Sequence, residues 1–173
     1  TRNIPMLRRK ADWVMEQANF ARGGHSAKTL RKIVESYPRE ELWQMSREEL
    51  LRIALGVLHL FDRPRARVFL RRDRFNRFVT ALAYIPKDRF NTDLREGVGE
   101  AIARAYGGKV ESFAPQLGEN QLARVLFVIG DIDKTRRDPD LHALDAEVSR
   151  LARTWEDDFN SALLNSDLFD VAA

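Results

Sequence analysis

Cysteine is absent from this 173-residue chain, so it can form neither disulfide bonds nor thiolate metal sites. No apolar run approaches the roughly 20 residues of a membrane-spanning helix, and no apolar signal segment opens the chain. These absences favour a reducing cytoplasm and argue against a membrane partner. The first residue is Thr1 rather than methionine, which predicts that the sequence is part of a longer protein.

The sequence also lacks the residue patterns of catalytic and cofactor sites. The nearest match to a dinucleotide fingerprint is Gly97-Val98-Gly99, but Ile102 occupies the third glycine position and the run falls inside a predicted helix. The three histidines stand too far apart for metal-ligand spacing: His25, His59 and His142. No Ser-His-Asp or Cys-His set can be assembled. We therefore expect no catalytic, cofactor-binding or metal-binding residue in this segment.

Charge is present but unevenly divided. Residues 1–90 contain 20 Lys and Arg against 10 Asp and Glu, whereas residues 91–173 contain 9 against 16. Two solvated faces that partly neutralise each other are the favoured interpretation. The alternative is that the basic half binds an anion, a polyanion or a neighbouring domain.

The first part of the chain has helical periodicity. Pro5 is suited to the first turn of a helix, Ser26 to the N-cap of a second, and Ser46 with Glu49 to the capping box of a third. Pro64 ends this pattern. We expect a small helical subdomain over residues 1–62.

After Pro64 the apolar period changes from 3.6 to 2 residues. The predicted strands cover residues 65–72, 77–85, 109–117 and 122–129. A helix capped by Asn91 or Thr92 follows the second strand and ends at Gly107-Gly108. A last helix starts at Asp138-Pro139, with an apolar stripe that includes Trp155, Phe159 and Leu163. The fold class is α+β: a ferredoxin-like ββαββα plait over residues 63–165, with both helices on one face and a frayed tail at 166–173.

Seven arginines fall within residues 63–77, opposed only by Asp73. If a four-residue loop pairs Arg72 with Arg77, Val68 and Leu70 face the helices. Arg67, Phe69, Arg71 and Phe78 then share the other face and are the candidate contacts for a partner or effector. Arginine stems between aromatic rings suit a protein interface or cover for their own sheet. A nucleobase-stacking surface is the alternative, but the Gly/aromatic signature of ferredoxin-like RNA binders is missing, which argues against nucleic acid.

A similar register in the second hairpin pairs Leu117 with Leu122. It places Phe113, Leu117 and Leu126 beside Phe69 on the face away from the helices. An apolar patch of that size is rarely exposed on a monomer, so we expect protein from outside the plait to cover it.

Four segments together resemble the N-terminal regulatory region of the large bacterial NAD-specific glutamate dehydrogenases. They are Tyr37–Gln44, the run HLFDRPRARVFLRRDRFNRFVTALAYIPKDRFNTDLRE at residues 59–96, LARVLFVI at Leu122–Ile129, and Trp155–Asp158. The resemblance implies that the plait is ACT-like and lies in a long chain whose separate catalytic domain deaminates glutamate to 2-oxoglutarate with NAD. It maps no catalytic residue here.

The resemblance also implies partners. These are other domains of the parent chain, a second copy in a homo-oligomer, and a small effector such as an amino acid bound near a glycine-bearing strand-to-helix loop. That loop would be Gly130–Asp138, and Gly130 is the one position that matches. NAD would bind in the parent enzyme and not in this segment.

Overall fold

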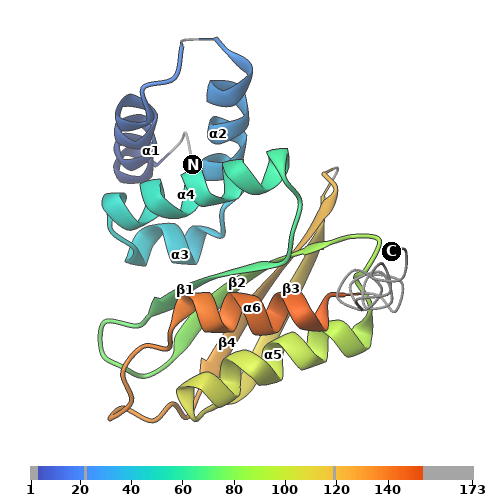
Figure 1. The fold of residues 1–173 in the computed structure, drawn as a ribbon. Coiled ribbons are helices and arrows are strands. Elements are labelled where there is room, and N and C mark those ends of the chain that lie inside the picture. The colour runs from blue at the N-terminus through green and yellow to red at the C-terminus, as the bar shows by residue number, and fades with distance from the viewer. Residues whose placement is uncertain (1–3, 22, 119, 154–173) are drawn as a thin grey trace, which may run out of the picture. The chain divides into compact units, whose positions relative to one another are not determined.

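The computed structural model describes residues 4–21, 23–118 and 120–153 (Figure 1). The chain divides into two compact units, Thr1–Arg63 and Pro64–Ala173. The first is helical, and the second contains every described strand.

The helical unit consists of α1 (Pro5–Ala18), α2 (His25–Ser36), α3 (Arg39–Gln44) and α4 (Arg47–Asp62). Pro5 begins α1 as predicted, and Ser46 and Glu49 form the predicted capping box at α4. The prediction for α2 was wrong by two residues: Gly24 is its N-cap, and Ser26 lies inside the helix. The short helix α3, which follows Pro38, was not predicted.

Helix α4 packs against α1 and α2. Its buried side chains, which include Leu50, Ala54 and Val57, recur at the spacing of one helical face.

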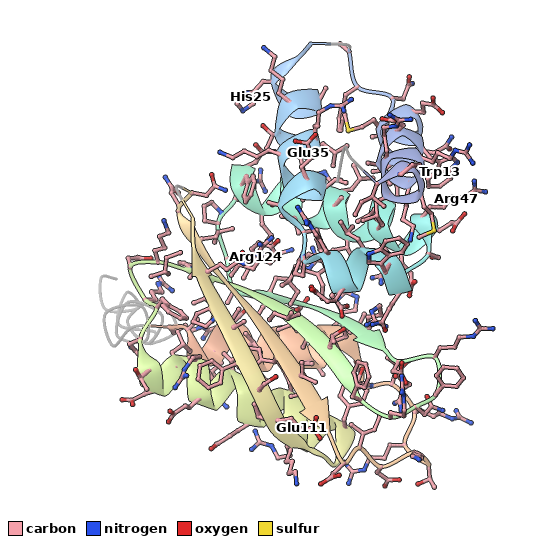
Figure 2. All side chains as sticks on the ribbon, turned by 180° about the vertical axis from the view of Figure 1, so that it is seen from behind. Trp13, His25, Glu35, Arg47, Glu111 and Arg124 are labelled. Atoms are coloured by element: carbon pink, nitrogen blue, oxygen red, sulfur yellow. The ribbon has the colours of Figure 1, made fainter. Side chains whose placement is uncertain are left out.

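Lys10 of α1 fixes the end of α3, because its Nζ donates to the carbonyls of Leu42 and Met45 at 2.6 and 2.7 Å. Those carbonyls lack intrahelical partners. Partial burial lowers the pKa of Lys10. The guanidinium of Arg47 stacks 4.6 Å above the ring of Trp13 (Figure 2).

The second unit has the predicted ββαββα order. It contains β1 (Arg67–Arg72), β2 (Val79–Pro86), α5 (Thr92–Tyr106), β3 (Lys109–Leu117), β4 (Leu122–Gly130) and α6 (Leu141–Leu151). The strands form one antiparallel sheet in the order β1-β2-β4-β3. Helices α5 and α6 lie side by side on one face of it (Figure 1). This is the strand order of a ferredoxin-like plait whose chain begins one strand earlier, so the predicted α+β fold is confirmed.

The core of this unit lies between the sheet and the two helices. Its buried side chains include Val79, Ile85, Val98, Ile102, Tyr106, Val125, Phe127, Ile129, Leu144 and Val148. Gly99 of α5 allows close packing, since a Cβ there would come within 3.0 Å of the Phe127 ring. The glycines at 97 and 99 therefore belong to helix-sheet packing.

The ends of α5 follow the prediction, whereas those of α6 do not. The Asn91 side chain accepts a 2.8 Å hydrogen bond from the Leu94 amide, and Gly107 closes α5 with a φ of 63°. The N-cap of α6 is Asp140 and not Asp138. Helix α6 ends at Leu151, short of the predicted stripe. Trp155, Phe159 and Leu163, and the predicted tail at 166–173, lie outside the described residues.

The register of the first hairpin differs from the prediction by two residues. Arg72 pairs with Val79 rather than Arg77, and Val68 pairs with Ala83. The cause is Asp73, whose amide donates to the Phe78 carbonyl at 3.0 Å, so that the loop starts one residue later. A shift of two residues leaves each side chain on its face. Val68 therefore faces the helices, as predicted.

The second hairpin contains a β-bulge that changes its register. Val110 pairs with Ile129, which is the predicted register, but Ser112 pairs with Val128 and Leu117 with Ala123. A shift of one residue exchanges the faces of β3 beyond the bulge. Phe113 consequently lies on the helix side, where the guanidinium of Arg95 sits 3.8 Å from its ring. The prediction that Phe113 and Leu117 join the opposite face was wrong.

The two edges of the sheet are protected by different means. Side chains of α6 bond to the β1 backbone: the Val68 amide donates to Asp145 at 2.9 Å, and the Ser149 hydroxyl donates to the Ala66 carbonyl at 3.3 Å. Strand β3 carries its bulge and Pro115, both of which disfavour pairing with a further strand.

Gly108 is the glycine whose replacement we expect to be most damaging to this fold. A Cβ there would overlap the backbone oxygen of Gly130, which cannot move without disturbing β4. Gly108→Ala should lower the free energy of unfolding by about 1–3 kcal/mol, as overpacking does. Chemical denaturation measures this. The matched control is Gly118→Ala, where a Cβ meets nothing within 4 Å. Equal stability of the two variants would contradict the packing argument.

Candidate effector pocket and arginine-rich hairpin

The arginine cluster of residues 63–77 is dispersed over several separate contacts. Arg67 lies 3.5 Å from the Asp145 carboxylate, and its guanidinium lies 5.3 Å from the ring of Phe69. Arg72 donates to Asp138 at 2.8 Å and stacks on Tyr106. Arg77 donates to Asp73 at 2.9 Å. Arg67 therefore contacts α6, Arg72 the loop before α6, and Arg77 the β1–β2 loop.

The four candidate contact residues share one face of the hairpin by strand alternation. Phe69 is buried, pairs with Leu82, and meets Tyr84 edge to face with ring centroids 5.9 Å apart. Arg71 is buried and pairs with Thr80, whose hydroxyl donates to the Arg71 carbonyl at 3.4 Å. Phe78 is half-buried under Arg77. Their contact with a partner or effector stays a prediction, as does cover of this face by outside protein.

The face that carries the four candidate contacts offers nothing in support of the nucleic-acid alternative. A stacking platform needs exposed rings with cations beside them. Phe69 is buried, and its neighbour Arg67 is engaged with Asp145.

Asp73 organises the loop between β1 and β2. Its carboxylate is 4% exposed and accepts hydrogen bonds from the Phe75 amide at 3.1 Å and from the Arg77 guanidinium at 2.9 and 3.3 Å. The Arg77 hydrogen bond is the main cause that lowers the pKa of Asp73 to about 2. The same bond raises the pKa of Arg77. Asn76 adopts the left-handed conformation, with a φ of 53°, that completes the turn.

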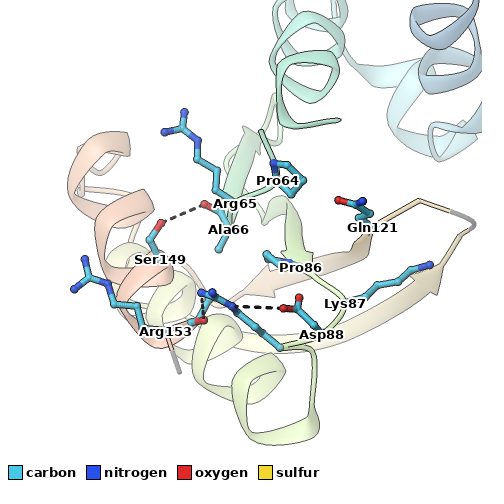
Figure 3. A pocket seen from close by; sticks show the side chains of 11 residues that line it. Pro64, Arg65, Ala66, Pro86, Lys87, Asp88, Gln121, Ser149 and Arg153 are labelled. Carbon is cyan, nitrogen blue, oxygen red and sulfur yellow. Dashed lines mark hydrogen bonds and ion pairs between the residues drawn. The ribbon is translucent and has the colours of Figure 1, made fainter. Parts of the chain in front are cut away.

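A pocket of about 660 Å³ opens at the other end of the same two strands (Figure 3). The residues before β1, the β2–α5 connection and the end of α6 form its walls. Among the residues that the structure describes, four cationic side chains line it against a single carboxylate, that of Asp88: Arg65, Lys87, Arg89 and Arg153. Such a pocket suits a small ligand that carries a negative group.

Arg89 and Asp88 supply opposite charges side by side in this pocket. The Arg89 guanidinium donates to the Ala152 carbonyl at 3.1 Å and lies 3.9 Å from the Asp88 carboxylate (Figure 3). The side chains of Arg65 and Lys87 point away from the centre in this view. Sequence reasoning missed these residues. The available signal was the turn Pro86-Lys87-Asp88-Arg89, which separates a predicted strand from a predicted helix cap.

The β4–α6 loop was expected to resemble an effector site, but side chains of the protein itself occupy the space around it. A Cβ on Gly130 would overlap the carboxylate of Glu111, a residue at the bulge (Figure 2). Gly130 therefore makes room for Glu111. Arg136 donates to the Arg104 carbonyl at 3.1 Å, and Asp138 holds Arg72. Burial and the nearby Asp138 raise the pKa of Tyr106.

The part of the chain that the structure describes contains neither a metal-binding cluster nor a membrane-spanning helix. No group of three or more His, Cys, Asp or Glu side chains there could hold a metal ion. None of the described helices is long and apolar enough to cross a membrane.

The permuted plait with its two helices on one face places the second unit among ACT-like α+β domains, here following a helical unit. A family model of the glutamate dehydrogenase ACT2 domain matches residues 67–156, and one of glutamate dehydrogenase helical motif 1 matches residues 4–63. The chain belongs to the glutamate dehydrogenase family, of which it carries these two parts.

Two curated relatives agree with this assignment. The NAD-specific glutamate dehydrogenase of Halomonas elongata is 38% identical over 161 residues, which cover 93% of this chain and 10% of that protein. The NAD-specific glutamate dehydrogenase of Pseudomonas aeruginosa is 33% identical over 164 residues, which cover 95% of this chain and 10% of that protein. The chain thus spans about a tenth of the length of these relatives.

Removal of the Asp73 charge should weaken the hairpin in a pH-dependent way. Because the folded-state pKa is lowered to about 2, Asp73 stabilises the fold fully above its unfolded pKa of about 3.9. This contribution declines as the pH falls from about 4 toward 2. Wild-type protein should therefore melt at a higher temperature than Asp73→Asn at pH 7, and the difference should shrink below pH 4.

Asp131→Asn is the matched control. Its carboxylate pairs with Lys109 at 2.7 Å, but both side chains are about two-thirds exposed, so little stability should be lost at any pH. If the difference in melting temperature between wild type and Asp73→Asn stayed constant from pH 7 to pH 2, the proposed role of the Asp73 charge would be contradicted.

Proposed function

We propose that this chain is a non-catalytic regulatory segment of a long NAD-specific glutamate dehydrogenase, which converts glutamate to 2-oxoglutarate and ammonia. The observation that carries the proposal is the match of residues 67–156, which include every described strand and helix of the sheet unit, to the ACT2 domain of that family. The chain spans only about a tenth of its relatives, which leaves ample length for a catalytic domain elsewhere.

NAD, on this proposal, binds in another part of the parent enzyme. The glycines at 97 and 99 are the segment's nearest approach to a dinucleotide fingerprint, and they lie in the middle of α5 rather than at its start. Gly99 packs against Phe127 and Val110. The cytoplasm remains the expected location, and other domains of the parent and a second copy remain the expected protein partners.

We further propose that the pocket beside Arg89 takes a small amino acid. A free amino acid carries a carboxylate and an ammonium group on one carbon. Arg89 is suited to the carboxylate and Asp88 to the ammonium, because their side chains lie 3.9 Å apart on the same wall. Arg153 at the rim favours an amino acid whose side chain adds a second negative charge.

Calorimetric titration of the purified chain with a panel of amino acids tests the pocket. Asp88→Asn should weaken binding at least tenfold, about 1.4 kcal/mol. Arg153→Ala, at the exposed rim, should weaken it less. Lack of binding by any amino acid would refute the effector pocket and leave the rest of the proposal intact.

The same preparation tests the absence of catalysis. Incubated with glutamate and NAD, it should form no NADH, because the described part of the chain contains no nucleotide-binding fold. Glutamate-dependent NADH formation that survives stringent purification would overturn the regulatory assignment.

A further inference from the structure

We propose that the tip of the β1–β2 hairpin, residues 73–78, is a rigid docking point for another domain of the same long polypeptide, one that offers an apolar pocket rimmed by carboxylates. The inference rests on the proposed function only in requiring a longer parent chain. It concerns a surface that is separate from the effector pocket, at the opposite end of the two strands.

Phe75 at the tip is 69% exposed, more than any other large apolar side chain in the described part of the chain. Single exposed apolar residues are common on protein surfaces. Exposure alone would therefore not identify a docking point. The structure of the loop around Phe75 supplies the second observation.

The loop is held in one conformation by a carboxylate that is almost completely buried. Asp73 accepts the Phe75 amide at 3.1 Å and the Arg77 guanidinium at 2.9 Å, and its carbonyl accepts the Asn76 amide at 3.0 Å. The same bonds set the register of the hairpin, and they leave the loop ordered before any partner binds. A loop that is already ordered loses less conformational entropy when it binds, so its exposed ring can contribute more to affinity.

The chemistry of the tip indicates what it would bind. Arg77 lies over the rings of both Phe75 and Phe78, at 5.2 and 5.6 Å from their centres, and Arg74 beside them is exposed. An aromatic ring flanked by arginines has the composition of an interface hot spot. The ring calls for an apolar pocket. Arg74, together with the exposed part of Arg77, whose guanidinium already pairs with Asp73, calls for carboxylates around it.

A second copy of this chain fits these requirements poorly. The pocket beside Arg89 has four cations and one carboxylate, and the pocket of about 540 Å³ between α1 and the start of α4 has three cations and two carboxylates. Several acidic residues of the sheet unit are paired within it, including Asp131, Asp138 and Glu147. The relatives leave about nine tenths of their length for other domains, which a shared backbone keeps at high effective concentration.

The absence of cysteine from this chain allows a direct test. Arg74→Cys, which keeps the neighbouring Phe75 ring, is introduced into the 173-residue chain and into the full-length protein, and alkylation by N-ethylmaleimide is followed by peptide mass spectrometry. The isolated chain should react at the rate of an unprotected thiol, and the full-length protein at least tenfold more slowly. Arg150→Cys, on the exposed side of α6, is the matched control and should react at the same rate in both.

Each other outcome overturns the proposal. Equal alkylation rates of the Arg74→Cys variant in the two proteins would show that no domain covers the tip. Protection in the isolated chain that grows with protein concentration would assign the tip to a second copy. Protection by single-stranded RNA at physiological salt would assign it to nucleic acid. Because the readout is a labelling rate, failure of the glutamate dehydrogenase assignment would be seen separately, in an activity assay of the full-length protein.

Discussion

The arrangement of the sheet unit depends on the buried carboxylate of Asp73. Its bonds to the loop amides and to Arg77 set where the β1–β2 turn begins, and this fixes the pairing of Arg72 with Val79. The register in turn places Arg72 where it reaches Asp138, ahead of α6. One acidic side chain among seven arginines therefore determines how the cluster is distributed. Without it, the guanidinium groups would share a turn with no counter-charge.

The position of α6 follows from contacts along the whole length of β1. Asp138, before the helix, binds Arg72 at the end of the strand. Asp145 accepts the Val68 amide, and Ser149 donates to the Ala66 carbonyl near the strand's start. These bonds satisfy backbone groups of an edge strand that would otherwise face water. They also explain why α6 carries polar residues on a side that faces the sheet edge.

The sequence was sufficient to predict the order of the elements in the sheet unit, because apolar periodicity and caps such as Asn91 are local signals. Pairing was harder to predict. A loop of four residues can start at Asp73 or Arg74, and only the hydrogen bonds of the folded Asp73 select one. The bulge at Glu111 depends on room made by Gly130 across the sheet, which no local pattern reveals. For the same reason the arginine-rich hairpin was predicted, whereas the pocket, which is assembled from four distant segments, was not.

The pocket and the hairpin tip occupy opposite ends of β1 and β2, which gives any communication between them a defined route. The strands pair antiparallel over Arg67–Arg72 and Val79–Tyr84, so their ends move together unless hydrogen bonds break. Helix α6 spans the same distance, with Ala152 at the Arg89 side and Asp138 at the Arg72 side. A ligand can shift a domain equilibrium only by binding one state more tightly. An effector would therefore act on docking at the tip if it changed the Arg89–Ala152 contact and, through α6, the hydrogen bond between Arg72 and Asp138.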